Sequence, residues 1–188
     1  MPSTLSEALL LEYMLARSTD PTERIVLLQH AIDNITGTFY TQVMFADYEL
    51  RAHRLIEQDQ PITAEILTET YTQLFKEYYG DSIDMNPFTG ITWSRIPHFF
   101  NSPYYVYQYA TCFASAAKIS RQIMGGGKES DEARDRFLAL LRSGGSDYPM
   151  ELLRTAGVDL SQPDTVRAVV DQLDDLVTRL EHELDNRQ

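Results

Sequence analysis

Hydrogen-bonding side chains are concentrated in residues 93–110, which read WSRIPHFFNSPYYVYQYA. His98 is followed in this stretch by one asparagine and four tyrosines, namely Asn101, Tyr104, Tyr105, Tyr107 and Tyr109. Imidazole, amide and phenol groups donate hydrogen bonds, and in a cleft that excludes water such donors stabilise an oxyanion. The stretch therefore indicates a hydrogen-bonding cleft, although the same residues also serve as local caps and as core residues.

Two prolines bracket these side chains and indicate how the chain positions them. Proline restricts the residue before it to extended geometry, and it is favoured in the first turn of a helix. Pro97 and Pro103 therefore predict a loop that delivers side chains to a cleft, followed by a helix from Pro103 to Met124.

The expected helix has an apolar side and a polar side. The apolar side carries Tyr105, Tyr109 and Cys112, and we expect Cys112 to be a buried, unreactive core residue. The polar side carries Tyr104 and Tyr107, which makes these two tyrosines the better candidates for contact with a ligand.

The rest of the chain predicts an all-α fold. Spacings of three and four residues between apolar side chains, together with capping residues, predict further helices near residues 1–12, 21–58, 61–80, 129–142, 148–155 and 163–184. Ser3 or Thr4 is expected to cap the first of these helices. The periodicity disappears in residues 80–102, where we expect one long loop or a short hairpin around Ile91–Trp93.

Composition and charge exclude several classes of protein. A formal net charge of −12 and a pI near 4.6 disfavour nucleic acids as partners, because proteins that bind them use clustered Lys and Arg. No apolar run approaches the roughly 20 residues of a membrane-spanning helix, and no basic segment followed by an apolar one begins the chain. A single cysteine excludes an internal disulfide. We therefore expect a cytoplasmic protein with no nucleic-acid or membrane partner.

No self-contained metal site is expected in the 188 residues of the chain. A metallopeptidase helix of the HExxH type needs two histidines four residues apart, with a glutamate next to the first. His182 and Glu183 supply only the first half of this motif, because Asn186 stands where the second histidine is required. His30 and His53 are too far apart on one expected helix to share a metal ion.

Two stretches resemble a known family of enzymes. Arg95–Phe99 reads RIPHF and Tyr105–Thr111 reads YVYQYAT, and both are similar to the pattern of the oligoendopeptidase F family, zinc peptidases related to the thimet oligopeptidases. Shorter similarities at Tyr78–Gly80, at Ile91–Trp93 and near residues 140–149 extend the resemblance over nearly the whole chain. It implies a mostly α-helical part of a zincin-like oligopeptidase catalytic domain.

The first residues, MPSTLSE, resemble the segment that follows the third zinc ligand of these peptidases, a glutamate. In this comparison that glutamate and the HExxH helix fall before Met1, so residues 1–188 correspond to a single C-terminal portion of the catalytic domain. The resemblance implies a zinc cofactor in the intact enzyme and none in this chain. It implies oligopeptide substrates, cleaved by a zinc-bound water with the HExxH glutamate as base. We expect the chain alone to be inactive.

The resemblance also implies roles for individual residues. His98, Tyr107 and Tyr105 would bind the substrate and hydrogen-bond the tetrahedral oxyanion, and Tyr107 ranks first because it meets both the family pattern and the polar side of the helix. Glu7 matches the last glutamate of the family segment and would orient a ligand histidine without touching the metal. Further substrate contacts are expected from Tyr104, Arg95 and Asn101.

A second interpretation places the chain in another class. It would be a truncated, non-enzymatic helical protein whose exposed cleft wall pairs with itself or with a separate N-terminal part. An incomplete domain should in either case expose apolar surface that promotes association.

Overall fold

Helices account for all regular structure in the described part of the chain, residues 1–186 of a computed structural model, and this confirms the expected all-α fold. The chain divides into two units. Unit 1 contains Met1–Phe39 and the residues from Thr111 onward, whereas unit 2 is the continuous segment Tyr40–Ala110. None of the described helices is long and apolar enough to cross a membrane.

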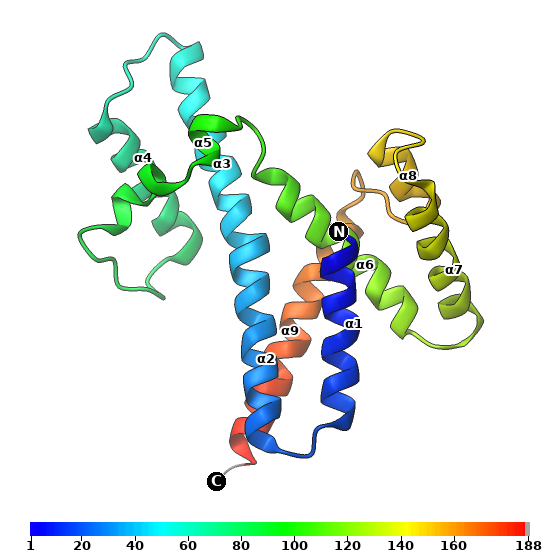
Figure 1. Ribbon diagram of the computed structural model, residues 1–188. Helices are drawn as coiled ribbons and strands as arrows, with labels where there is room; N and C mark the ends of the chain where they lie inside the picture. The colour runs from blue at the N-terminus through cyan, green and yellow to red at the C-terminus, as the bar shows by residue number, and fades with distance from the viewer. Residues whose placement is uncertain (187–188) are drawn as a thin grey trace. The chain divides into compact units, whose positions relative to one another are not determined.

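Unit 1 is built on three helices from the two ends of the chain, α1 (Pro2–Arg17), α2 (Pro21–Ile35) and α9 (Pro163–Asp185). In Figure 1, α9 lies beside α2, and α1 lies next to α2 on the other side of a short turn. The side chain of Asp20 ends that turn, because it accepts a hydrogen bond from the Thr22 N–H at 2.9 Å and so caps α2.

The cap expected for α1 does not form. This helix begins at Pro2, and Met1 precedes it without any hydrogen bond from a side chain, so Ser3 and Thr4 lie inside the first turn. The N–H groups in the first turn of a helix have no acceptor within the helix. Proline, which has no N–H, therefore loses no hydrogen bond there and is favoured at this position. The proline, and not a hydroxyl, therefore sets the start of α1.

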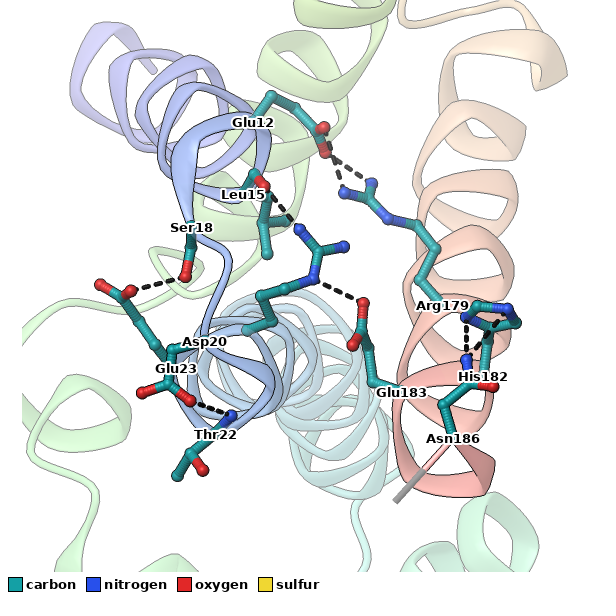
Figure 2. Close-up of polar contacts among 11 residues, drawn as sticks. Glu12, Leu15, Ser18, Asp20, Thr22, Glu23, Arg179, His182, Glu183 and Asn186 are labelled. Atoms are coloured by element: carbon teal, nitrogen blue, oxygen red, sulfur yellow. Dashed lines mark hydrogen bonds and ion pairs between the residues drawn. The ribbon is translucent and has the colours of Figure 1, made fainter. Parts of the chain in front are cut away.

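Two ion pairs connect α9 to the first two helices, as Figure 2 shows. Arg179 contacts both carboxylate oxygens of Glu12 on α1, at 2.7 and 3.2 Å. Arg24 on α2 contacts Glu183 on α9 at 2.5 Å and also donates to the carbonyl oxygen of Leu15. The four charged side chains are only 15% to 37% exposed. Removal of one partner would therefore leave a poorly solvated charge without compensation.

The remaining helices of unit 1 follow unit 2 in the sequence. They are α6 (Tyr107–Met124), whose first turn still belongs to unit 2, then α7 (Gly127–Ser143) and α8 (Pro149–Thr155). One core cluster joins side chains of α1, α6 and α7 to the segment around α8. Its buried members are Leu5, Ala116, Ile119, Phe137, Ala156 and Val158.

Unit 2 contains α3 (Thr41–Glu57), α4 (Ala64–Tyr79), the 3-10 helix η2 (Thr89–Arg95) and the short helix α5 (His98–Asn101). Its core is rich in aromatic rings, which bury large areas and supply much of the packing energy of a small unit. The buried residues of this core are Met44, Phe45, Tyr48, Tyr71, Leu74 and Val106.

The sequence predicted the ends of α4 correctly. Thr63 caps the helix by accepting a hydrogen bond from the Ile66 N–H at 3.3 Å, and Gly80 ends it with a φ of 55°, a conformation that glycine adopts readily. The helix expected over residues 21–58 is interrupted, because a π-helical turn, η1 (Thr36–Tyr40), separates α2 from α3 around Gly37.

The hairpin expected around Ile91–Trp93 is wrong, since no strand forms in any described residue of this segment. These residues belong to η2, which packs on α4. The Trp93 indole N–H donates to Thr68 Oγ1 at 3.2 Å, and Gly90 is so close that a Cβ atom there would lie 2.5 Å from Thr72 Oγ1. Packing against α4, which has no local signal in the sequence, therefore gives the segment its helical turns.

The helix expected from Pro103 begins at Tyr107 instead. Tyr104 has a φ of 56°, in the left-handed region that a right-handed helix excludes. Tyr104 and Tyr105 therefore belong to the connection between α5 and α6, and their assignment to the two sides of a helix is wrong.

Candidate substrate-binding site

The structure brings three of the clustered side chains together in unit 2, and we call His98, Tyr105 and Tyr109 the His98 cluster. The Tyr109 hydroxyl oxygen lies 3.3 Å from His98 Nε2. The rings of His98 and Tyr105 stack, with centroids 5.4 Å apart and an interplanar angle of 16°. The Tyr109 ring meets both edge-on, with centroids 5.8 Å from His98 and 5.5 Å from Tyr105.

The core of unit 2 holds the cluster in place through its sequence neighbours. Phe99, next to His98, has its ring centroid 5.7 Å from that of Phe45 and 5.2 Å from that of Tyr48. Val106, next to Tyr105, is only 1% exposed. Successive residues of a helix point about 100° apart, so packing of the partly buried Phe99 against the core leaves His98 half-buried at its edge.

The Tyr109 hydroxyl stays protonated near neutral pH. Partial burial raises its pKa above the ordinary value of 10.0, and the neighbouring Tyr105 raises the pKa further through like charge and hydrogen bonding. A protonated phenol remains a hydrogen-bond donor. The tautomer of His98 decides whether Nε2 accepts this proton or donates its own to the tyrosine oxygen.

A neutral phenol beside an imidazole can serve the chemistry of acyl transfer. Both groups donate hydrogen bonds to a carbonyl oxygen, and the bonds strengthen when that oxygen gains negative charge in a tetrahedral intermediate. Tyr105 is 41% exposed and Tyr107 is 50% exposed, so their side chains are also accessible to a ligand.

The other predicted substrate contacts lie outside the cluster. Arg95 and Asn101 are exposed, as is Tyr107 at the start of α6. Among the described residues, no hydrogen bond, ion pair or ring contact joins these three side chains to His98. The Tyr104 ring packs at a tilt against His53 of α3, with centroids 4.6 Å apart.

Glu7, which was predicted to orient a ligand histidine, lies in unit 1. It is exposed on α1, and its Oε2 accepts a hydrogen bond from the Asn34 side chain on α2 at 3.3 Å. This contact holds the carboxylate against α2. Its action on a ligand histidine stays a prediction.

The sequence pattern missed Tyr109 as a site residue, because the expected helix placed it on an apolar side with Cys112. Cys112 is in fact exposed, so the prediction of a buried thiol is wrong. The five residues of α6 that follow it, 113–117, are all buried. The signal that points to Tyr109 is its place in the YVYQYAT motif, two residues after Tyr107.

The described residues do not fit a metal ion by themselves. In residues 1–186, no three His, Cys, Asp or Glu side chains are grouped so that they could hold one. The His98 cluster contains one imidazole and two phenols, which suits hydrogen bonding and not the binding of zinc. The side chains of this cluster can therefore contribute hydrogen bonds to a substrate.

The comparison with protein families assigns this fold to a class of peptidases. The model described as Peptidase family M3 matches residues 1–171, and the chain belongs to this family. M3 is a family of zinc metallopeptidases. Within it, several relatives of this chain are oligoendopeptidase F proteins.

Two curated relatives illustrate the extent of the similarity. The chain is 39% identical to the oligopeptidase PepF of Bacillus subtilis, over 95% of this chain and 26% of the relative. It is 37% identical to an oligoendopeptidase F homolog of Borreliella burgdorferi, over 89% of this chain and 28% of the relative. The chain therefore spans about a quarter of the length of these relatives.

A solved structure agrees with this assignment. The crystal structure of oligoendopeptidase-F from Enterococcus faecium superposes with a TM-score of 0.90 at 36% identity, covering 98% of this chain and 34% of that one. The helical fold of the chain is thus that of the corresponding third of an oligoendopeptidase F.

Proposed function

We propose that residues 1–188 supply the substrate-binding side of a zinc metallopeptidase of the oligoendopeptidase F type, which cleaves oligopeptides when joined to its metal-binding part. The observation that carries the proposal is the His98 cluster, in which the Tyr109 hydroxyl lies 3.3 Å from His98 Nε2. Membership of family M3 and the names of the relatives support a peptide as substrate.

In this proposal the exposed face of the cluster binds the peptide. His98 and Tyr109 orient each other, and one of them or Tyr107 donates a hydrogen bond to the carbonyl oxygen of the bond to be cleaved. That bond strengthens as the oxygen becomes an oxyanion, which lowers the barrier. Contacts along the rest of the peptide come from the exposed side chains of Tyr104, Tyr105, Arg95 and Asn101.

The metal and the general base belong, in this proposal, to a different part of the catalytic domain. The 188 residues contain no HExxH sequence. Residues 1–188 then form one portion of that domain, and Glu7 orients a ligand histidine that another portion supplies. The chain by itself should bind peptides without hydrolysing them.

Binding can be tested on the chain through its imidazole NMR signals. The sequence contains four histidines, so His98 can be assigned with the His98→Ala variant. Titration with an oligopeptide should shift the His98 signals and leave those of the exposed His30 in unit 1 unchanged. Unshifted His98 signals at saturating peptide would refute the binding role.

Hydrolysis is tested separately. The purified chain, supplied with zinc, should not cleave a quenched-fluorescent oligopeptide. Zinc-dependent cleavage that His98→Ala abolishes would show that the chain is active alone and would overturn this part of the proposal.

A second candidate function is assembly with another copy or with a separate polypeptide. The observation that favours it is apolar exposure in unit 1, where Leu10, Tyr13 and Val26 are 55% to 61% exposed. Concentration-dependent association in sedimentation, abolished by Leu10→Glu with peptide binding intact, would support assembly beside the peptidase role. A monomer at all concentrations would refute assembly with itself.

A further inference from the structure

We propose that Glu49 is a positioning residue: its buried carboxylate holds Tyr104 in a left-handed backbone conformation and thereby sets the geometry of the His98 cluster. The meaning of that geometry for peptides rests on the function proposed above. The role of Glu49 in setting it concerns unit 2 alone and can be measured without a substrate.

The first observation is the burial and the partner of Glu49. This residue of α3 is only 4% exposed, which is rare for a carboxylate, since carboxylates are almost never fully buried unless they are paired. Its Oε1 accepts a hydrogen bond from the Tyr104 backbone N–H at 2.6 Å. No ion pair of Glu49 occurs in the described part of the chain. The buried carboxyl group thus contacts a backbone amide 55 residues later.

The second observation is the conformation of the residue that Glu49 contacts. Tyr104 has a φ of 56°, which is unfavourable for a bulky side chain. Such a conformation persists only where its surroundings determine it. The hydrogen bond from its N–H to the Glu49 side chain is one such determinant, because a buried acceptor left without its partner would cost free energy.

The third observation is that α3 holds Tyr104 at two points. His53 lies four residues after Glu49, so both side chains lie on one face of α3. The His53 ring packs on the Tyr104 ring, with centroids 4.6 Å apart and an interplanar angle of 34°. Glu49 fixes the backbone of Tyr104, and His53 fixes its ring.

The position of Tyr104 connects this anchor to the cluster. The chain leaves α5 at Asn101, adopts a left-handed conformation at Tyr104 and enters α6 at Tyr107. The next residue, Tyr105, stacks on His98 at 5.4 Å. If Tyr104 relaxed to a right-handed or extended conformation, the direction of the following residues would change. Tyr105 and Tyr109 would then lose their contacts with His98.

The test uses the whole 188-residue chain and the variants Glu49→Ala and Glu49→Gln, with Glu57→Ala as a control at an exposed position of the same helix. In Glu49→Ala, exchange of the Tyr104 amide hydrogen should be about ten- to a hundredfold faster, and the His98 imidazole signals should lose the shifts caused by the Tyr105 and Tyr109 rings. Glu49→Gln keeps an acceptor oxygen and should give intermediate values. Unchanged exchange and unchanged His98 signals in Glu49→Ala would refute the proposal.

A rescue experiment separates positioning from a general need for Glu49 in the core. Glycine adopts a positive φ without strain, so Tyr104→Gly removes the conformational cost that Glu49 offsets. In this background Glu49→Ala should displace the His98 signals by less than half as much as it does with Tyr104 present. Equal displacement, or unfolding by Glu49→Ala in both backgrounds, would show that Glu49 acts only on the core. Unfolding that Tyr104→Gly prevents would support the proposal.

The outcomes remain distinct from those of the proposed function. The amide and imidazole signals of the peptide-free chain report on Glu49, whereas the peptide titration reports on binding. A chain that binds no peptide but shows the rescue would refute the proposed function and support the positioning role. The opposite pair of results would do the reverse.

Discussion

The hydroxyl oxygen of Tyr109 lies 3.3 Å from Nε2 of His98, although the two side chains belong to different helices, α6 and α5. This contact gives His98 a partner that is fixed by a regular helix and not by a loop. A hydrogen-bonding group held in this way loses little conformational freedom when a ligand binds.

The Tyr109 hydroxyl can therefore be tested as part of the peptide site. Tyr109→Phe keeps the ring contacts and removes the hydrogen bond, so the dissociation constant for an oligopeptide should rise about three- to tenfold. Titration of the chain followed by the His98 NMR signals measures this constant. Tyr148→Phe, at a tyrosine that is 80% exposed in unit 1, is the matched control and should change nothing. An unchanged affinity in Tyr109→Phe would exclude the hydroxyl from the site.

A buried hydroxyl in unit 2 predicts a stabilising substitution. Tyr48 is 2% exposed, and its hydroxyl has no hydrogen-bond partner among the described residues. An unpaired buried hydroxyl is destabilising, so Tyr48→Phe should raise the free energy of unfolding by about 1 kcal/mol at pH 7. Urea unfolding measures the difference. A loss of stability in the variant would show that the hydroxyl has a partner such as a bound water.

The same residue predicts a pH dependence. Burial raises the pKa of Tyr48 above its ordinary value of 10.0, and the nearby Tyr71 raises it further. Above pH 10 the unfolded chain therefore releases this proton while the folded chain keeps it, and the stability that was present at lower pH is lost. The free energy of unfolding should fall less steeply above pH 10 in Tyr48→Phe than in the wild type. Burial also raises the pKa of Tyr71. Part of the decrease in the free energy of unfolding above pH 10 should therefore remain in Tyr48→Phe.

The ion pairs of unit 1 should differ in their contribution to stability. Arg24 and Glu183 are 26% and 15% exposed, whereas Arg121 and Asp171, also 2.5 Å apart, are 64% and 42% exposed. Arg24→Met should cost about 1 to 3 kcal/mol, because it strands Glu183 and the Leu15 carbonyl, and Arg121→Met should cost less than about 0.5 kcal/mol.

Urea unfolding of both variants provides the measurement. Addition of Glu183→Leu to Arg24→Met should recover part of the loss, because it removes the stranded charge. Equal losses in the two single variants would contradict the assignment of Arg24 to a poorly solvated pair.

The thiol of Cys112 should react freely. Because this cysteine is exposed, an aromatic disulfide reagent should modify one thiol per folded chain at a rate close to that of a free thiol at the same pH. Absorbance at the wavelength of the released thiolate follows the reaction. Modification that requires urea would show instead that the thiol is protected.

Local signals in the sequence predicted most of the helices and failed where distant contacts decide the conformation. Thr63 and Gly80 mark the ends of α4 correctly because capping depends on a few neighbouring residues. The helical turns of η2 pack against Thr68 and Thr72 on α4. The residues near η2 in the sequence contain no signal that predicts this packing.

In the candidate site, too, local sequence signals predicted some features and missed those that depend on distant contacts. The motif identified His98 and Tyr105, which the structure places in contact. Tyr105 lies before the start of α6. The expected helix included it, and on that helix Tyr109 and Cys112 were assigned to the same apolar side as Tyr105. The conformation of Tyr104 depends on Glu49, and periodicity cannot relate positions so far apart.

The division of unit 1 into two stretches has a consequence for the order of folding. Unit 2 is one continuous segment, so all of its residues leave the ribosome before α9 is made. In contrast, Arg24 and Glu12 of unit 1 can form their ion pairs only after α9 has been synthesised, because their partners lie 159 and 167 residues later in the chain. Long-range closures of this kind are slow, and segments that await them are prone to aggregate. During synthesis α1 and α2 therefore remain without their third helix the longest, which lengthens the time in which their unpaired surfaces can aggregate.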